Sequence, residues 1–209
     1  MKNVLSVFWV TIGFIYLSGF IGAHAAARYQ LDATHSTVGF AVKYKLFSTV
    51  RGKFNDVRAI AEIDEATGNL SSVRAEIKVA SVDTDNPKRD RHLRSDDFFN
   101  AQRFPNITFE STNLKLEGNG EYRVDGILTI RDVSKPITLK GKMLGKIPGR
   151  VAFEAAGQIN RQDFNVTWNK ALQVVGGLMV SDEVDLNICL LYTSPSPRDS
   201  VVSRMPSSA

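Results

Sequence analysis

The chain has 209 residues, with 26 lysine and arginine residues against 22 aspartate and glutamate residues and a formal net charge of +4. This length suits one domain with appended segments, and so small a charge excess excludes an extended nucleic-acid-binding surface. Cys189 is the single cysteine, which excludes an internal disulfide, a multi-cysteine zinc site and an iron–sulfur cluster.

The N-terminal segment has the pattern of a secretory signal peptide. Lys2 precedes an apolar run over residues 4–21, and small residues follow it. A positive start, an apolar stretch and an A-x-A pattern are the three parts of such a leader. We therefore expect residues 1–27 to be a signal peptide cleaved between Ala25 and Arg28. An uncleaved membrane anchor is the alternative, because the run is nearly long enough to span a bilayer.

The middle of the chain, residues 28–188, is predicted to be a single antiparallel all-β domain. Apolar and polar side chains alternate with period two, which is typical of strands with one face in a core and the other in water. The alternation covers 38–44, 73–79, 122–130, 151–159 and 184–188. Turn signals stand at 64–69, 117–120 and 148–149. A change of apolar parity predicts a bulge near Ser111 and Thr112. Such strands, with almost no helix between them, indicate a sandwich or a closed barrel.

One charged segment, residues 86–100, interrupts the strand pattern. Pro87 suits the first turn of a helix, and Leu93 and Phe98 can dock one face of that helix. We expect a short helix and a loop across one end of the strands. The charge run over residues 88–94 is either a solvated helix face or a cationic rim that holds an anionic or polar headgroup.

The C-terminal segment, residues 189–209, is predicted to be a disordered and non-native tail. It is rich in serine and proline and has no hydrophobic period. Residues 190–200, LLYTSPSPRDS, resemble read-through translation at the ends of assembled metagenomic sequences. The strand that ends at Ile188 meets this segment without a turn signal. We expect the tail to have replaced the natural end of the last strand and to weaken barrel closure.

Residues suited to metal binding or catalysis are few. Without the leader, His35 and His92 are the only histidines, so we expect no metal site. His35 and Ser36 suggest an envelope hydrolase, with Asp32 or Asp90 as the acid. However, the G-x-S-x-G pattern is absent, and these residue types are also typical of a strand start and turn. We expect no catalytic residue and keep the hydrolase as the alternative function.

Six motifs resemble those of the YceI-like family. They are Tyr29–Asp32 with His35, Ser36 and Val38–Phe40, then Ser48–Phe54, Arg89–Phe99, Phe104–Ser111, Gly126–Ile130 and Ile159–Phe164. The resemblance spans about residues 29–188, and its most specific parts are R-D-x-H-L-x-S-x-x-F-F and F-P-x-I-T-F. There are departures from the family pattern. Tyr44 stands where the family often has histidine, and residues 131–136 replace its usual G-V-T-x-P turn.

The resemblance implies a lipocalin-like antiparallel barrel in the bacterial periplasm that binds a polyisoprenoid, of quinone or polyprenyl phosphate type, in its lumen. No cofactor is implied. The residues expected to line the lumen and contact the chain are apolar or aromatic: Val38, Phe40, Val42, Val73, Ile77, Val79, Phe109, Leu128, Ile130, Phe153, Ile159 and Trp168. The residues expected at the headgroup rim are His35, Arg89, Arg91 and His92.

The expected partner is therefore an isoprenoid lipid, with transient contact to the inner-membrane surface or to envelope enzymes. A third interpretation is a barrel with a filled interior that docks on envelope enzymes through residues 86–100. The two interpretations differ in whether the lumen is hollow.

Overall fold

The computed structural model describes residues 26–44, 48–169 and 180–194, and most of the predicted signal peptide therefore lies outside the described residues. The strands are β1 (Ala26–Leu31), β2 (Thr37–Tyr44), β3 (Ser48–Phe54), β4 (Val57–Asp64), β5 (Leu70–Lys78), β6 (Val82–Asp83), β7 (Asn106–Gly118), β8 (Glu121–Ile130), β9 (Val133–Ile147), β10 (Arg150–Asn160) and β11 (Val180–Thr193). The helices are α1 (Pro87–Arg94) and three short 3₁₀ helices, η1 (Ala33–His35), η2 (Val79–Ser81) and η3 (Arg161–Phe164).

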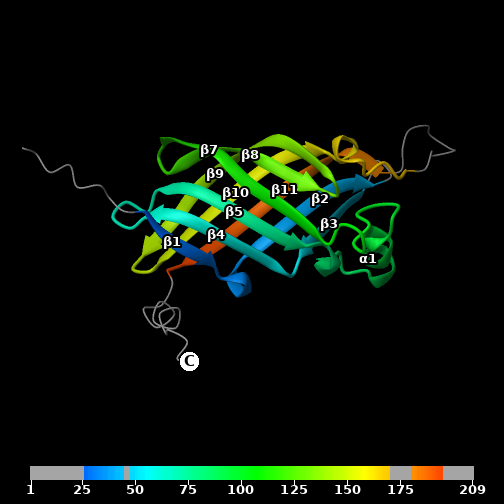
Figure 1. Ribbon diagram of the computed structural model, residues 1–209, viewed down its shortest axis with the longest axis horizontal. Helices are drawn as coiled ribbons and strands as arrows, with labels where there is room; N and C mark the ends of the chain where they lie inside the picture. The colour runs from blue at the N-terminus through cyan, green and yellow to red at the C-terminus, as the bar shows by residue number, and fades with distance from the viewer. Residues whose placement is uncertain (1–25, 45–47, 170–179, 195–209) are drawn as a thin grey trace, which may run out of the picture.

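Within the described residues, eight strands close into an antiparallel barrel (Figure 1). Their order is β1-β4-β5-β7-β8-β9-β10-β11, and β1 pairs with β11 to complete the ring. The same edge of β11 that pairs with β1 also pairs with β2. Strand β3 pairs with β2, and β6 pairs with β3, so these three strands extend the sheet beyond the ring. The closed ring confirms the all-β prediction and decides between the sandwich and the barrel in favour of the barrel.

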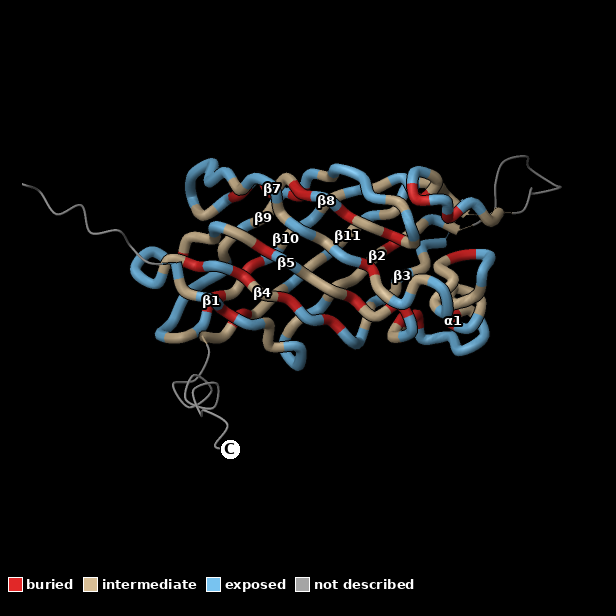
Figure 2. Tube along the Cα trace, viewed as in Figure 1, coloured by how far each residue is buried: buried red, intermediate tan, exposed pale blue. Residues whose placement is uncertain are grey.

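Buried and less buried residues alternate along the strands, as the colours in Figure 2 show along the barrel wall. In β4, for example, Ala59, Ala61 and Ile63 are buried, whereas Arg58 and Glu62 are exposed. The buried residues form two clusters, one around Ile63 near the β4–β5 turn and one beside α1. The period-two alternation predicted from the sequence is therefore the alternation between lumen and solvent.

The predicted turns and bulge are confirmed. Asn119 and Gly120, with φ of 52° and 75°, connect β7 to β8, as in a two-residue type I′ turn. Gly149, with φ of 72°, follows Pro148 between β9 and β10, which fits a type II turn. The pairing of β7 with β8 shifts register between Ser111 and Asn113, where the parity change predicted a bulge.

The predicted helix is also confirmed, as α1, and it lies at one end of the barrel (Figure 1). The side chain of Asn86 caps its first turn by accepting a hydrogen bond from the Arg89 N–H, and Pro87 is its first residue. Asp90 is buried and accepts hydrogen bonds from the backbone N–H and the hydroxyl of Thr84 at 3.0 and 2.5 Å. Asp90 thus ties the helix to the chain immediately after β6.

The barrel extends beyond the predicted bounds of residues 28–188 at both ends. Ala26 and Ala27 already pair with β4. The last strand does not end at Ile188 but continues to Thr193. The ring closes through this extension, because Gln30 pairs with Thr193 and Leu31 with Tyr192. The bound predicted at Ile188 followed the serine and proline content of the tail and missed the apolar residues that continue the alternation of β11. Residues 195–209 lie outside the described part of the chain.

Candidate functional site

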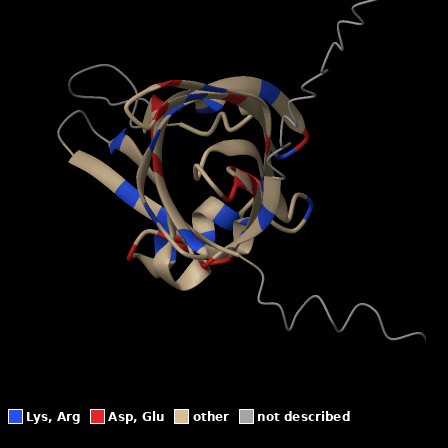
Figure 3. Ribbon diagram, turned by 90° about the vertical axis from the view of Figure 1, so that its left-hand side faces the viewer, with Lys and Arg blue, Asp and Glu red and all other residues tan. Residues whose placement is uncertain are grey.

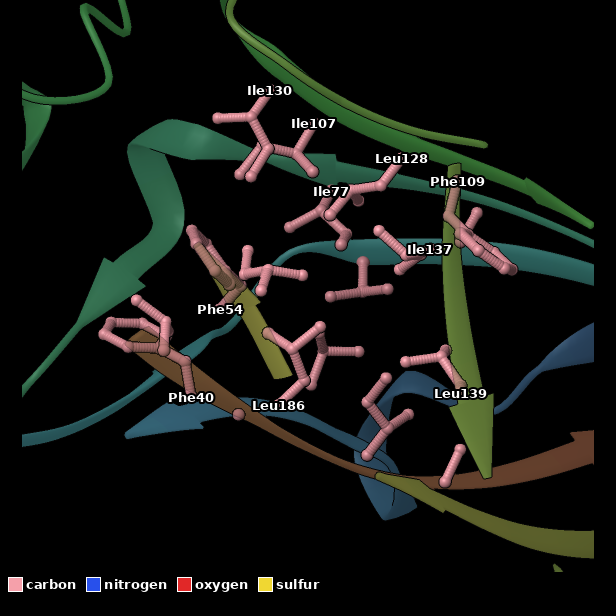
Figure 4. A pocket seen from close by; sticks show the side chains of 18 of the residues that line it. Phe40, Phe54, Ile77, Ile107, Phe109, Leu128, Ile130, Ile137, Leu139 and Leu186 are labelled. Atoms are coloured by element: carbon pink, nitrogen blue, oxygen red, sulfur yellow. The ribbon is translucent and has the colours of Figure 1, made fainter. Parts of the chain in front are cut away.

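The interior of the barrel contains a cavity of about 640 Å³. Apolar side chains from opposite walls converge on it, among them Phe54, Ile137 and Leu186 (Figure 4). Its size falls in the range of small-molecule and cofactor sites. The lumen is therefore hollow, and the interpretation of the protein as a barrel with a filled interior is wrong.

Glycines on neighbouring strands make room for two phenyl rings that line the cavity. A Cβ atom at Gly126 would stand 2.4 Å from the Phe109 ring, and one at Gly52 would stand 2.4 Å from the Phe40 ring. Both distances are too short for a real contact, so a larger residue in either place would displace the ring. The pairing of a large aromatic residue with a glycine on the neighbouring strand therefore keeps space free in the lumen.

Three aromatic rings close the end of the cavity that lies away from α1. Phe153 stands between Tyr122 and Tyr192, with ring centroids 6.0 and 6.3 Å apart and edge-to-face orientations. All three side chains are buried. Burial raises the pKa of both tyrosines. Among the described residues, the buried Tyr192 hydroxyl has no hydrogen-bond partner, and an unpaired buried hydroxyl is destabilising.

A second aromatic group lies at the α1 end. The rings of His92, Phe98 and Trp168 contact one another at centroid distances of 4.9 to 5.1 Å. All three line the cavity. The His92 Nε2 atom lies 2.8 Å from a carboxylate oxygen of Asp97, which fixes the ring in this group.

Polar and cationic groups of α1 also reach the α1 end of the cavity, where Lys88 and Arg89 are part of the lining. Arg89 donates from Nε to the Thr84 hydroxyl and from Nη2 to the Thr84 carbonyl, both at 2.7 Å. Elsewhere, Lys and Arg are interspersed with Asp and Glu around the barrel (Figure 3). The α1 end is therefore suited to a ligand whose polar part lies at its end.

Arg161 is a structural residue of this end that the sequence reasoning did not single out. Its side chain is only 6% exposed. It donates hydrogen bonds to the carbonyls of Val166, Trp168 and Ser181 at 2.5, 3.0 and 2.9 Å. It also pairs with the Asp182 carboxylate at 2.7 Å. Burial lowers the pKa of Arg161, and Asp182 opposes that shift. Arg161 is part of the family motif at residues 159–164, which could have pointed to it. The alternation of apolar and polar residues could not, because it does not distinguish a buried arginine from an exposed one.

The cavity brings together every residue predicted for the lumen except Val79. The predicted residues in its lining are Val38, Phe40, Val42, Val73, Ile77, Phe109, Leu128, Ile130, Phe153, Ile159 and Trp168. Val79 is buried but lies outside the lining, so its assignment to the lumen was wrong. β5 ends at Lys78, and Val79 begins η2 with its N–H bonded to the Pro105 carbonyl. The strand alternation therefore ends at Lys78, one residue before Val79, and does not place the Val79 side chain in the lumen.

Two of the four predicted rim residues, Arg89 and His92, line the cavity, whereas His35 and Arg91 do not. His35 lies in η1 with its side chain 66% exposed, and its Nδ1 lies 2.8 Å from the Asp32 carboxylate. This hydrogen bond lowers the pKa of Asp32. Arg91 is exposed on the helix. The lining face of α1 consists of Lys88, Arg89, His92 and Leu93, and at 3.6 residues per turn Arg91 is rotated away from the middle of that face. The assignments of His35 and Arg91 to the rim of the cavity were therefore wrong.

The residues of the hydrolase alternative are not arranged for nucleophilic catalysis. The Ser36 hydroxyl accepts a hydrogen bond from the Leu191 N–H at 2.9 Å, and the His35 ring is bonded to Asp32. Asp90 is buried against Thr84. Within the described residues, no hydrogen bond joins the Ser36 hydroxyl to the His35 ring, which the nucleophile and base of such a triad require.

Residues 26–44, 48–169 and 180–194 contain no group of three or more His, Cys, Asp or Glu side chains placed to hold a metal ion. No helix in this part of the chain combines the length and the apolar character needed to cross a membrane.

A closed antiparallel barrel with an apolar cavity and a helix at one end defines the class of lipocalin-like binding barrels. Comparison with known proteins identifies the family within this class. The model of the YceI-like domain matches residues 29–191, and the chain belongs to this family. The protein YceI of Salmonella newport (strain SL254) is 38% identical over 153 residues, which cover 70% of this chain and 80% of the relative. The protein YceI of Salmonella agona (strain SL483) is 37% identical over 173 residues, or 79% and 87% of the two chains.

Solved structures show the same fold. The YCEI protein of Campylobacter jejuni is 34% identical, with a TM-score of 0.65 and coverage of 79% of this chain and 97% of that one. BcnA of Burkholderia cenocepacia is 25% identical, with a TM-score of 0.68 and coverage of 77% and 98%. A polyisoprenoid binding domain from Saccharophagus degradans is 18% identical, with a TM-score of 0.63 and coverage of 81% and 99%, and it is similar in fold.

Proposed function

We propose that this protein is exported to the periplasm and carries or sequesters a polyisoprenoid lipid, of quinone or polyprenyl phosphate type, with its chain in the barrel cavity. Membership of the YceI-like family supports the proposal. The fold is also that of a Saccharophagus degradans domain described as polyisoprenoid-binding. The observation that carries the proposal is the apolar cavity of about 640 Å³.

The chemistry of the lumen matches that of an isoprenoid chain. Such a chain has no hydrogen-bonding groups, so it leaves no polar group unpaired in an apolar lumen. Each buried CH₂ contributes about 0.8 kcal/mol, so one five-carbon unit contributes several kcal/mol before the costs of ordering the chain are subtracted. Hydrophobic burial alone is therefore enough to retain a few units.

The headgroup is placed at the α1 end in this proposal. Lys88 and Arg89 line the cavity there, and both are cations suited to a phosphate or to the oxygens of a quinone. The opposite end is closed by three aromatic rings. A ligand with one polar end and one apolar chain therefore has a single favourable orientation, with the polar end at α1.

The proposal predicts that isoprenoid lipid co-purifies with the protein. Ala75 lines the cavity on β5, and Ala75→Phe fills part of it. Ala156 is exposed on β10, so Ala156→Phe is a matched substitution on the outer surface. Organic extracts of the three proteins, purified from the periplasmic fraction of cells, are compared by mass spectrometry. We expect isoprenoid with the wild type and Ala156→Phe, and at least tenfold less with Ala75→Phe. Extracts of the wild type that repeatedly lack isoprenoid would refute the proposal.

Export is expected to involve cleavage after Ala25. An A-x-A pattern ends at Ala25 and another at Ala27, but β1 begins at Ala26 and pairs Ala26 with Asp64. Cleavage after Ala27 would remove two paired residues of the barrel. The intact mass of the periplasmic protein is expected to correspond to a chain beginning at Ala26. A mass that retains the apolar run would instead support the membrane anchor.

A further inference from the structure

The cavity is closed at one end by an aromatic floor formed by Tyr122, Phe153 and Tyr192. These rings line the cavity and are 3%, 5% and 0% exposed. Phe153 contacts both tyrosines edge to face, with interplanar angles of 74° and 70°. Such contacts stabilise the rings beyond the burial of their area.

The floor is held from behind by hydrogen bonds and packing. The Tyr122 hydroxyl donates to the side-chain oxygen of Asn69 at 3.1 Å and accepts from the Leu70 N–H at 3.4 Å. Behind the rings, Ile63 and Val151 are completely or almost completely buried in the same cluster. A chain that enters from the α1 end therefore meets a wall of rings that belong to the same buried cluster as Ile63 and Val151.

The cavity volume sets how much chain fits above this floor. Because the cavity of about 640 Å³ ends at the floor, a prenyl chain can extend inward only until its last unit meets these rings. We propose that the aromatic floor, with Phe153 at its centre, determines the chain length that this protein prefers. The inference rests on the proposed function and adds to it a limit on the ligand.

Phe153 is the appropriate residue to vary. Tyr192 lies in the segment interpreted from the sequence as a replacement of the natural strand end, whereas Phe153 is the fourth residue of β10 and lies outside that segment. Ala155 is the next residue on the same face of β10 and also lines the cavity. A smaller side chain at Phe153 is expected to lengthen the cavity, and a larger one at Ala155 is expected to shorten it.

The test measures affinity against chain length by calorimetry, using all-trans prenyl monophosphates of two to ten isoprene units. For the delipidated wild-type protein, we expect affinity to rise with chain length up to an optimum and then to stop rising or to fall. Phe153→Ala removes a six-carbon ring, so it is expected to move the optimum up by about one unit. Ala155→Leu is expected to move it down, and it provides the test even if Phe153→Ala does not fold.

The matched control is Phe109→Ala, the same substitution in the side wall. Phe109 packs against both buried clusters, between the floor and the α1 end. Its removal widens the lumen without lengthening it, so we expect the optimum chain length to stay unchanged. An optimum that does not move in Phe153→Ala and Ala155→Leu, or that moves equally in Phe109→Ala, would overturn the inference and leave the carrier function intact. Absence of binding at every chain length would refute the carrier function itself.

Discussion

Replacing Arg161 with alanine is expected to destabilise the barrel by several kcal/mol, because its nearly buried side chain donates to three carbonyls and hydrogen bonds to charged groups contribute about 1.5–3 kcal/mol each. The substitution leaves the carbonyls of Val166, Trp168 and Ser181 without their donor. Asp182 also loses its cationic partner. These acceptors belong to the chain after η3 and to the first residues of β11, so the loss separates two segments that Arg161 holds together.

The measurement is urea-induced unfolding followed by circular dichroism, with Arg123→Ala as the control. Arg123 also pairs with an aspartate, Asp125, at 3.1 Å, but on the exposed outer face. Exposed pairs contribute little, so the control is expected to unfold almost like the wild type. Arg161→Lys keeps the charge but loses the planar fork of donors, and it should fall between the two. Equal unfolding midpoints for Arg161→Ala and Arg123→Ala would contradict the assigned role of Arg161.

A chain that ends at Ile188 is expected not to form a stable barrel, whereas a chain that ends at Ser194 is expected to fold like the full chain. The shorter chain loses Tyr192, which is completely buried, and removal of a large buried aromatic side chain costs about 3–5 kcal/mol. It also loses the register between residues 189–193 of β11 and Arg150–Glu154 of β10. Loss of the β1–β11 pairs at Tyr192 and Thr193 opens the ring.

Thermal unfolding of the two truncated proteins and the full chain checks this expectation. The chain that ends at Ser194 lacks most of the serine- and proline-rich tail, so it separates the contribution of the strand from that of the tail. A chain that ends at Ile188 and unfolds at the same temperature as the full protein would show that closure does not depend on the end of β11. The origin of residues 189–193 would then have no consequence for the fold.

Period-two alternation was sufficient to predict the lumen because the wall of a barrel has only two sides. Phe40 and Ile130 line the cavity for this reason. The rule failed at Val79, where the strand ends and a 3₁₀ helix begins. A strand end depends on local hydrogen bonds, such as the one from the Val79 N–H to the Pro105 carbonyl, and these are not part of the pattern.

The position of charged residues at the ends of the barrel was harder to predict than the lumen. Arg89 and Arg91 differ by two positions, and only the rotation of α1 about its axis decides that Arg89 lines the cavity. Arg161 resembles a surface arginine in the sequence, because its partners at Ser181 and Asp182 are distant along the chain. Composition also misjudged the end of β11, since serine and proline at 194–197 outweighed the apolar residues just before them.

Trp168 provides the most direct test of the central claim, that the lumen receives an apolar chain. The sequence has two tryptophans, and removal of the leader takes away Trp9 and leaves Trp168, which lines the cavity beside His92 and Phe98. Titration of the delipidated mature protein with a prenyl quinone is expected to quench Trp168 emission until one equivalent is bound, and Ala75→Phe is expected to abolish this saturation. Emission that never saturates, or that responds identically in Ala75→Phe, would contradict binding in the lumen.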